Sequence, residues 1–256
     1  MVARICGSRG QPIRMTPKPR LDQLLVDRGL VESREKAKAL ILAGEVSVNG
    51  QKQSKPGHTV PLDARVDLAS KPRYVGRGGL KLEGALQHFA IDPTGLTCLD
   101  IGSSTGGFTD CLLQHGAAKV YAIDAGTNQL DWKLRTDPRV IVHENLNARG
   151  LDRTHVPEPI DLLVCDVSFI SVTLVLPPAI PLLRDRASMV ILIKPQFEAG
   201  REQVGKGGIV RDPQVHEQVC QRIGSFVHEL GFAISMINSP ILGAQGNREF
   251  LLYAHS

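Results

Sequence analysis

The sequence predicts an α/β fold in which a small α+β module precedes a larger domain built on a parallel sheet. From residue 80 onward, short runs rich in Val, Ile and Leu alternate with helical stretches. Such near-continuous apolar strands are typical of a parallel sheet that is covered on both faces. Before that point, the apolar residues form two short helical stripes and a hairpin pattern. The chain has 256 residues, of which 42% are hydrophobic, which is enough for one small and one medium-sized domain.

Composition excludes several classes of protein. No apolar run approaches the roughly 20 residues of a membrane helix, so we expect no membrane as a partner. Residues 1–18 are basic and lack the apolar segment of a secretory signal, so we expect a flexible tail. The cysteines are odd in number and form no C-x-x-C pair, which argues against a disulfide framework or a metal site and favours a reducing cytoplasm. They are Cys6, Cys98, Cys111, Cys165 and Cys220.

Positive charge is concentrated in the first third of the chain. Residues 1–76 contain 14 Lys and Arg against 7 Asp and Glu, whereas the other 180 residues contain 16 against 19. This asymmetry indicates a polyanion-binding module in front of a mildly acidic domain. A basic tail with solvated helix faces would give the same counts, so charge alone leaves both interpretations open.

The first module has a clear local pattern. In "RLDQLLVDRGL" the leucines have helical spacing before Gly29, and in "ESREKAKALILAGE" Ser33 is placed to cap a second helix that ends at Gly44. In "EVSVNGQKQ" two valines alternate before Asn49-Gly50, which is a strong signal for a type I′ hairpin. The pattern therefore predicts two short helices followed by a hairpin.

This order of elements, with Arg and Lys on the helices, resembles the S4 RNA-binding module over residues 19–67. The resemblance implies structured RNA as the partner, recognised by its shape and phosphates more than by its bases. The residues expected to bind RNA are Arg20, Arg34 and Lys38, of which the last two are four apart and share one exposed helix face. Residues 68–76 contain Pro, Gly and basic residues without periodicity, and we expect them to form a linker.

Strand and helix patterns alternate through the larger domain. The expected strands are 97–101, 119–123, 139–143, 160–165, 188–193, 232–238 and 248–254, and the expected helices lie near 79–90, 107–115, 170–183 and 214–230. In an open parallel sheet, ligands bind at the carboxyl ends of the strands. The residues that follow each strand are therefore the candidates for a functional site.

A glycine-rich turn, "LDIGSSTGGFTDCLL", follows the first of these strands. Its glycines let the backbone approach a ligand closely, and the helix that begins near Gly107 points its N–H groups at the same place. The spacing is not G-x-G-x-x-G, so a dinucleotide is not favoured, and a simple tight turn is an open alternative. The residues expected to bind a cofactor here are Asp100, Gly102, Ser103, Ser104, Thr105, Gly106 and Gly107.

Polar residues after the next two strands extend this prediction. Asp124 ends the second strand, where an acid typically binds ribose hydroxyls. Asn145 and Asn147 follow the third strand and could lie near an adenine. Ordinary helix capping after a strand is the alternative for Asp124 and Asn145.

Four ionisable residues are candidates for catalysis. Asp166 ends the fourth strand in "LLVCDVSFIS", and Lys194 ends the fifth in "VILIKPQFE". Lys81 lies in the first helix of the domain, and Glu249 lies at the start of the last strand. Both positions border the same edge of a sheet of this type, so we expect the four to lie together.

Residues 79–256 resemble the FtsJ-type RNA ribose 2′-O-methyltransferases, whose signature is a Lys-Asp-Lys-Glu tetrad. The tetrad matches Lys81, Asp166, Lys194 and Glu249 in turn. With the S4-type module in front, the chain resembles the TlyA family, often labelled hemolysin A, whose phrases "GRGGLKL", "DIGSSTGGFTD", "KPQFE" and "GNREFLL" occur here. The resemblance implies a Rossmann-like class I methyltransferase domain over 77–256. It also implies S-adenosylmethionine as cofactor, bound partly by Asp166, and cytidine 2′-hydroxyls of ribosomal RNA as acceptors.

The chemistry of a ribose hydroxyl suits these residues. The hydroxyl is a poor nucleophile until it loses its proton, so Lys194 is the expected general base, oriented by Asp166. Glu249 is expected to orient Lys81 or the ribose. Positioning for in-line transfer would supply much of the remaining rate, and no metal is required.

Other functions are open alternatives. Cys165 could be the nucleophile of a pyrimidine carbon-5 methyltransferase, although a neighbour of Asp166 on a strand should face the packed layer. "DVSF" is not the motif expected of a base-amino methyltransferase. A membrane-lysing protein and a non-catalytic RNA-binding protein are two further classes. The polar loop 198–213 is expected to be either a lid that orders on RNA or a mobile surface loop.

Overall fold

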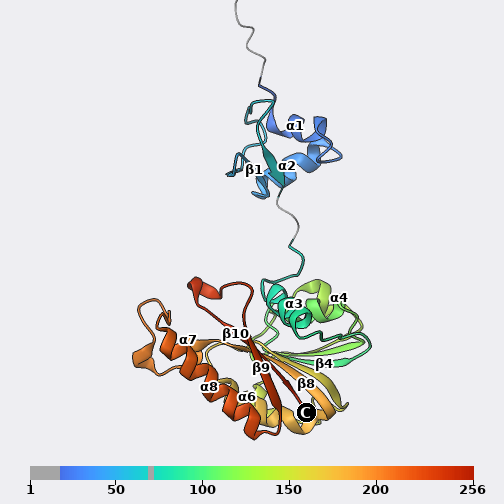
Figure 1. The fold of residues 1–256 in the computed structure, drawn as a ribbon. Helices are drawn as coiled ribbons and strands as arrows, with labels where there is room; N and C mark the ends of the chain where they lie inside the picture. The colour runs from blue at the N-terminus through green and yellow to red at the C-terminus, as the bar shows by residue number, and fades with distance from the viewer. Residues whose placement is uncertain (1–17, 69–71) are drawn as a thin grey trace, which may run out of the picture. The chain divides into compact units, whose positions relative to one another are not determined.

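The computed structural model describes residues 18–68 and 72–256, which form two compact units divided between residues 71 and 72 (Figure 1). The predicted tail, residues 1–18, lies outside the described residues except for Lys18, which is exposed. Each unit has its own apolar core, because the buried clusters contain residues from one unit only.

The small unit contains two helices and a three-stranded antiparallel sheet. The helices are α1 (Leu21–Asp27) and α2 (Arg34–Leu42), and the strands β1 (Val46–Val48), β2 (Gln51–Gln53) and β3 (Val66–Leu68) lie in the order β2-β1-β3. The predicted cap is present, since the Ser33 hydroxyl accepts a hydrogen bond from the Lys36 N–H at 3.2 Å. Asn49 and Gly50 both have positive φ, as the predicted hairpin turn requires.

The segment expected to be a linker, residues 68–76, has ordered structure at both ends. Leu68 is the last residue of β3, and the segment 72–76 packs into the large unit. Tyr74 is only 3% exposed, and the Val75 N–H donates to the Asp110 carboxylate at 2.9 Å. Pro and Gly in this segment suggested a free loop, but a buried aromatic ring and a partly buried hydrogen bond hold residues 74 and 75 against the domain.

The large unit is built on a seven-stranded sheet in the order β6-β5-β4-β7-β8-β10-β9. Its strands are β4 (Thr97–Ile101), β5 (Lys119–Ile123), β6 (Val140–His143), β7 (Ile160–Cys165), β8 (Leu183–Ile193), β9 (Ala233–Asn238) and β10 (Phe250–His255). Strands β4 to β8 are parallel, whereas β10 runs antiparallel to both β8 and β9. The predicted α/β fold with a Rossmann-like sheet is therefore confirmed, and one strand of the sheet, β10, is antiparallel to its neighbours. The chain returns from β9 to β10 without a crossover helix, which makes that pair antiparallel.

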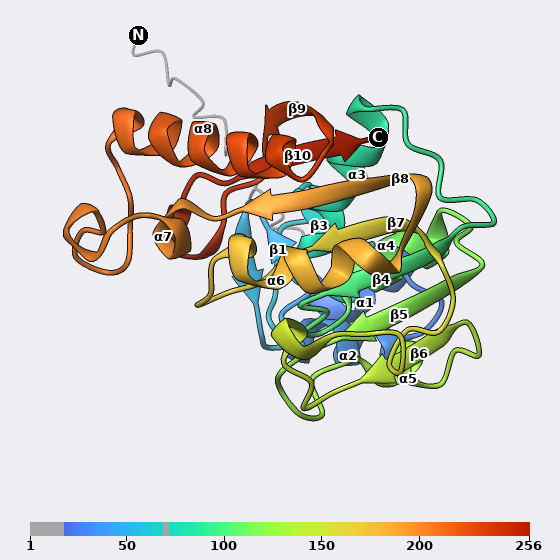
Figure 2. The same cartoon turned by 90° about the horizontal axis from the view of Figure 1, so that it is seen from below.

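Helices cover both faces of this sheet (Figures 1 and 2). Helices α3 (Gly78–His88) and α4 (Gly107–Gln114) share one apolar cluster with the sheet, and α6 (Val172–Ala179) and α8 (Pro213–Glu229) share the other. Two four-residue helices, α5 (Trp132–Arg135) and α7 (Pro195–Glu198), were not predicted because each is too short for a periodic pattern. Within the described ranges, no helix is long and apolar enough to cross a membrane.

Candidate active site

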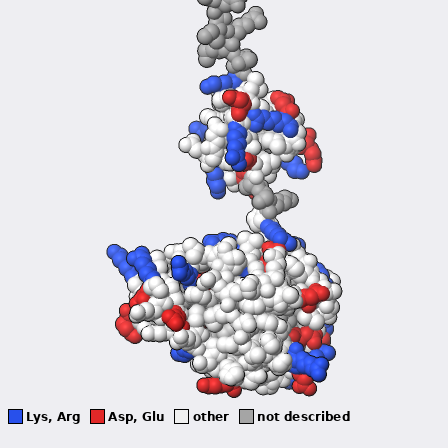
Figure 3. Space-filling model, viewed as in Figure 1, with Lys and Arg blue, Asp and Glu red and all other residues white. Residues whose placement is uncertain are grey.

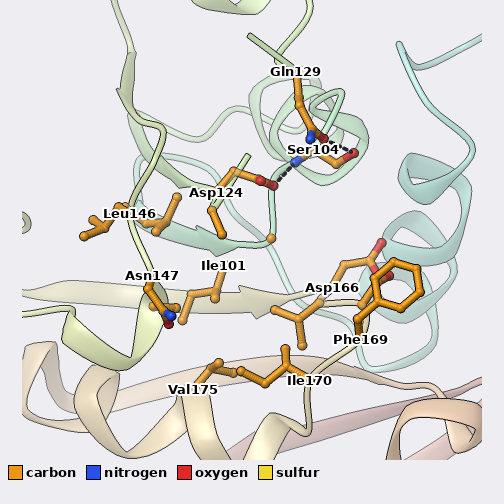
Figure 4. Close-up of a pocket in the computed structure, with 16 residues that line it drawn as sticks. Ile101, Ser104, Asp124, Gln129, Leu146, Asn147, Asp166, Phe169, Ile170 and Val175 are labelled. Carbon is orange, nitrogen blue, oxygen red and sulfur yellow. Dashed lines mark hydrogen bonds between the residues drawn. The ribbon is translucent and has the colours of Figure 1, made fainter. Parts of the chain in front are cut away.

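A cavity of about 450 Å³ opens at the carboxyl ends of the parallel strands (Figure 4). This volume lies within the range of about 300–1,000 Å³ that is usual for small-molecule sites. Its walls come from the residues that follow β4, β5, β6 and β7, and from the start of α6. The labelled lining residues are Ile101, Ser104, Asp124, Gln129, Leu146, Asn147, Asp166, Phe169, Ile170 and Val175.

The glycine-rich turn separates this cavity from a smaller one of about 160 Å³. Gly102, Ser104 and Asp166 line both cavities, so the two spaces meet at this turn. Of the other predicted turn residues, three line only the smaller cavity, namely Ser103, Thr105 and Gly107. Gly106 lines neither cavity. The turn therefore forms the wall between the two cavities.

Two glycines in this turn are required by conformation and by space. Gly102 has φ +85°, and a Cβ atom there would lie 2.6 Å from the Asp166 carbonyl oxygen. Gly106 has φ +96°, and a Cβ atom there would lie 2.2 Å from the Leu134 side chain. Gly102 thus lets the β4 turn and the β7 loop meet closely beside the cavity.

Asp124 holds the turn in place. One carboxylate oxygen accepts a hydrogen bond from the backbone N–H of Ser104 at 2.7 Å (Figure 4). The other accepts from the backbone N–H of Gly126, also at 2.7 Å. The Ser104 hydroxyl also donates to Gln129 at 3.4 Å. Asp124 also lies in the wall of the larger cavity.

Asp100 lies behind the turn and lines neither cavity. Its side chain is fully buried and accepts a hydrogen bond from the Thr109 hydroxyl of α4 at 2.6 Å. Burial is the largest influence on this carboxyl and raises its pKa to about 7, against the opposing effect of the Thr109 bond. Its place indicates support of the turn, not contact with a ligand in either cavity.

The two asparagines that follow β6 lie in different surroundings. Asn147 lines the cavity, whereas Asn145 does not. The Asn145 side chain accepts a hydrogen bond from the Thr127 hydroxyl at 2.7 Å. Glu144, which sequence reasoning missed, anchors the neighbouring loop by accepting from the backbone N–H groups of residues 128–130 and from Arg135. Burial alone would raise the pKa of Glu144, but these donors outweigh it and lower the pKa to about 2.

Lys194 and Asp166 form an ion pair of 2.7 Å at the ends of β8 and β7. The Lys194 ammonium also donates to the Ser168 hydroxyl at 2.7 Å. Both side chains are largely buried, and Asp166 forms part of the wall of both cavities. The ammonium of Lys194 is therefore held next to the cavity by two neighbours from a single loop.

Lys81 and Glu249 form a second pair at 2.5 Å, with side chains that are 10% and 2% exposed. Lys81 comes from α3, and Glu249 directly precedes β10. The β10–β8 register pairs Phe250 with Ile193, so Glu249 lies beside Lys194. The first turn of α3 also approaches Asp166, because a Cβ atom on Gly78 would lie 3.4 Å from its carboxylate. The structure thus brings the four predicted catalytic residues to one place as two ion pairs.

Cys165 cannot serve as a nucleophile in this arrangement. Its side chain is fully buried in the cluster shared with α6 and α8, and burial raises the pKa of its thiol. In the part of the chain that the structure describes, no group of three or more His, Cys, Asp or Glu side chains could hold a metal ion.

The predicted RNA-binding residues of the small unit have different surroundings. Arg20 and Arg34 both bind the buried Asp22 carboxylate, at 3.1 and 3.0 Å, and their own side chains are about half exposed. Lys38 is exposed on α2. Acidic and basic side chains are mixed on the face of this unit seen in Figure 3. Two of the three residues therefore also stabilise the fold of the unit.

The sheet order, the glycine-rich turn and the paired Lys-Asp and Lys-Glu side chains define the large unit as a methyltransferase of the α/β class. The FtsJ-like methyltransferase family model matches residues 74–256, and the S4 domain model matches residues 19–66. The chain belongs to the FtsJ-like methyltransferase family and carries an S4 domain, as the sequence predicts.

Three relatives illustrate this membership. The chain is 50% identical over 241 residues to YqxC of Bacillus subtilis, named as an rRNA methyltransferase, with 93% of this chain and 86% of that protein covered. It is 44% identical over 242 residues to the 16S/23S rRNA (cytidine-2′-O)-methyltransferase TlyA of Mycobacterium tuberculosis. That alignment covers 93% of this chain and 90% of the relative. A solved structure from Streptococcus thermophilus, named as a hemolysin, is 45% identical with a TM-score of 0.72, covering 94% of this chain and 89% of that one.

Proposed function

We propose that this protein transfers a methyl group from S-adenosylmethionine to ribose 2′-hydroxyls of ribosomal RNA, with cytidine as the target nucleoside. The observation that carries the proposal is the Lys194–Asp166 ion pair. Asp166 lies in the wall of the cavity, and Lys194 has an amine that can act as a general base once it is deprotonated. The choice of ribosomal RNA and cytidine rests on the name of the Mycobacterium tuberculosis relative. We expect the protein to act in the cytoplasm, where ribosomes are assembled.

The cavity suits a nucleoside with a charged side chain. Asp124 and Asn147 offer polar contacts on one side, while Ile123, Ile170 and Val175 form an apolar wall. Gly102 lets the β4 turn pack against the Asp166 backbone, so that both segments form the wall of the cavity. Residues 101–104, Asp124 and Asn147 would therefore hold S-adenosylmethionine, which supplies an electrophilic methyl group when it is bound.

Lys194 would remove the proton from the ribose hydroxyl. Its ammonium is fixed by Asp166 and Ser168, so the side chain needs little reorganisation before it meets the acceptor. To act, the lysine must reach the reaction in its neutral form, with its nitrogen directed at the hydroxyl proton. Asp166 orients the nitrogen, and Ser168 offers a second oxygen that fixes its direction.

The Lys81–Glu249 ion pair would position the ribose of the acceptor nucleotide. Glu249 is almost fully buried and lies beside Lys194, so it holds Lys81 at the same end of the sheet. A buried pair of this kind is costly to break, because removing one partner leaves an uncompensated charge. We assign this pair to orientation of the acceptor.

A transfer assay tests the function. Ribosomal RNA that lacks this modification is incubated with the protein and methyl-labelled S-adenosylmethionine, and the labelled RNA is then hydrolysed with alkali. We expect label in alkali-resistant dinucleotides, because a 2′-O-methyl group protects the following phosphodiester bond. Label on a base, or no transfer to RNA while the donor binds, would contradict the proposal.

A further inference from the structure

Two loops leave the catalytic edge of the sheet side by side. One runs from Asp166 to the start of α6, and the other runs from Lys194 through α7. At their near ends they are joined by the Lys194–Asp166 ion pair. Further out, the rings of Phe169 and Phe197 lie with centroids 4.9 Å apart.

Glu198 joins the far ends of the same loops. It is the last residue of α7, and its carboxylate accepts hydrogen bonds from the Val172 N–H at 2.8 Å and from the Ser171 hydroxyl at 2.7 Å. Ser171 is the N-cap of α6, so these bonds fix the point where the Asp166 loop enters that helix. The Arg222 guanidinium of α8 donates to the same carboxylate at 3.3 Å.

The Glu198 carboxyl is held in an environment that does not favour a charge. It is 9% exposed, and burial raises its pKa, while the bonds from Ser171, Val172 and Arg222 act in the opposite direction. Burying a carboxyl costs free energy, which hydrogen bonds must offset, and an apolar side chain would fill the same space without that cost. The hydrogen bonds of Glu198 therefore indicate a role beyond packing. Its partners come from α6 and α8, which lie on the same face of the sheet.

Helix α7 connects Glu198 to Lys194. The helix is a single turn of four residues that begins directly after Lys194, and the Phe197 N–H donates to the Lys194 carbonyl at 2.9 Å. A displacement of Glu198 would therefore shift the Lys194 backbone and the Asp166 loop relative to each other. The two partners of the catalytic ion pair would then lose their alignment.

We infer that Glu198 is a positioning residue, which fixes Lys194 against Asp166 by fastening the two loops at their far ends. This inference rests on the proposed function, because it concerns the reaction that Lys194 serves. Glu198 does not line the donor cavity. Its loss should therefore reduce the rate of transfer more than it weakens the binding of either substrate.

The test compares Glu198→Gln with Glu202→Gln, an exposed acid in the segment that follows. Donor-binding sites are counted by titration, and the single-turnover rate constant with saturating RNA is expressed per site. We expect Glu198→Gln to lower this rate constant by about 10- to 100-fold, since displacements near 1 Å cost on that order. The dissociation constants for donor and RNA should change less than about threefold, and Glu202→Gln should match the wild type.

Ser171→Ala provides the second arm, and it leaves the buried carboxylate in place if Glu198→Gln does not fold. It removes one of the bonds that fasten the loops, so we expect a smaller loss of rate. The double variant should lose less than the product of the two single losses, because both act on one connection. A wild-type rate per site in both variants, or fully multiplicative losses, would overturn the inference. If the wild type itself transfers no methyl group to RNA, the proposed function fails instead.

Discussion

At the scale of single residues, Lys194 is the side chain on which the proposed chemistry depends. Its nitrogen is 2.7 Å from both an Asp166 oxygen and the Ser168 hydroxyl. Neither neighbour can replace it as a base toward a ribose hydroxyl, because the serine is itself a weak acid and Asp166 already serves the ion pair. Lys194 is therefore the base that we assign at this place, and Asp166 and Ser168 are the groups that orient it.

Lys194→Ala should abolish methyl transfer and leave donor affinity nearly unchanged, because Lys194 does not line either cavity. Lys194→Arg should also fail, since an arginine stays protonated and its planar group does not fit the place of an ammonium. Transfer rates and donor titrations on both variants check this, with the exposed Lys206→Ala as control. Near-normal turnover by Lys194→Ala would remove the base from the mechanism.

Asp100 offers a prediction about stability. Its pKa is raised from 3.8 to about 7 in the folded protein, so the folded state favours the protonated form. The stability that this group contributes is present below about pH 4 and is lost as the pH rises through 7. Asp100→Asn cannot ionise, so its stability relative to the wild type should improve from pH 4 to pH 8, by up to a few kcal/mol at about 1.4 kcal/mol per pKa unit.

Thermal unfolding of both proteins across this pH range measures the difference. The exposed Asp185→Asn is the control and should follow the wild type at every pH. A constant difference between Asp100→Asn and the wild type would show that Asp100 ionises alike in the folded and unfolded states.

At the scale of elements, the turn after β4 is the part of the site that the backbone determines. Gly102→Val would place a β-branched side chain at φ +85° and against the Asp166 carbonyl oxygen. We expect donor affinity to fall at least about tenfold, because the turn must move away from the β7 loop to relieve both strains. Calorimetric titration with S-adenosylmethionine provides the measurement.

Gly150→Val is the matched control for this turn. Gly150 lies in a short 3-10 turn with open space around it and without positive φ, so its substitution should leave donor affinity unchanged. An unchanged affinity in Gly102→Val would instead place the donor outside this cavity.

The sequence predicted elements best where burial on both sides produced a continuous apolar run. The ranges 97–101, 119–123 and 160–165 coincide with β4, β5 and β7. β8 begins five residues before its predicted start, because Arg184, Asp185 and Arg186 are exposed and give no apolar signal. The direction of β10 could not be predicted, since apolar runs do not record which way a strand runs.

The candidate site was predictable at two places where a polar residue directly follows a strand. Asp124 and Asp166 illustrate this, and both line the cavity. Asn145 and Asn147 could not be separated, because the choice depends on a positive φ at Asn145 that turns its side chain toward Thr127. Glu144 directly follows β6 and binds the backbone N–H groups of residues 128–130, whereas Glu198 binds Ser171, Val172 and Arg222. These partners lie in other segments of the chain, so the sequence pattern did not indicate either role. The 198–213 loop is tied to the β10 side by Asn247, which contacts Val210 and Gly208.

At the scale of the whole molecule, the positive charge of the first third does not come from the S4 domain itself. Residues 19–67 contain eight Lys and Arg against seven Asp and Glu, and the remaining excess comes from Arg4, Arg9, Arg14, Lys18, Lys71 and Arg73. Two arginines of the domain are also engaged with Asp22. The shape of the domain and single exposed cations, not its net charge, should therefore determine RNA binding.

Lys38→Glu in the full chain tests this view, because Lys38 is exposed. Arg34→Glu is less suitable, because it would remove an ion pair with Asp22 and place a second negative charge beside that carboxylate. We expect RNA affinity to fall several-fold and the salt dependence to weaken by about one phosphate contact. The control is Lys206→Ala, in the large unit. Filter binding at several salt concentrations measures both quantities, and an unchanged slope would show that α2 does not meet the phosphates.

A chain of residues 72–256 tests the division between the two units. This unit has its own cores and contains the whole cavity, so it should fold and bind the donor with wild-type affinity. Its methylation of ribosomal RNA should collapse, because the S4 domain no longer holds the acceptor. Methylation at the rate of the full chain would contradict that role.

The most direct test of the central claim is a map of 2′-O-methyl groups in ribosomal RNA from cells that lack this protein and cells that express it. The same cells expressing Lys194→Ala serve as the matched comparison. We predict at least one cytidine that is methylated only with the wild-type protein and is unmethylated with Lys194→Ala. Identical maps in all three cells, or full methylation with Lys194→Ala, would contradict the account.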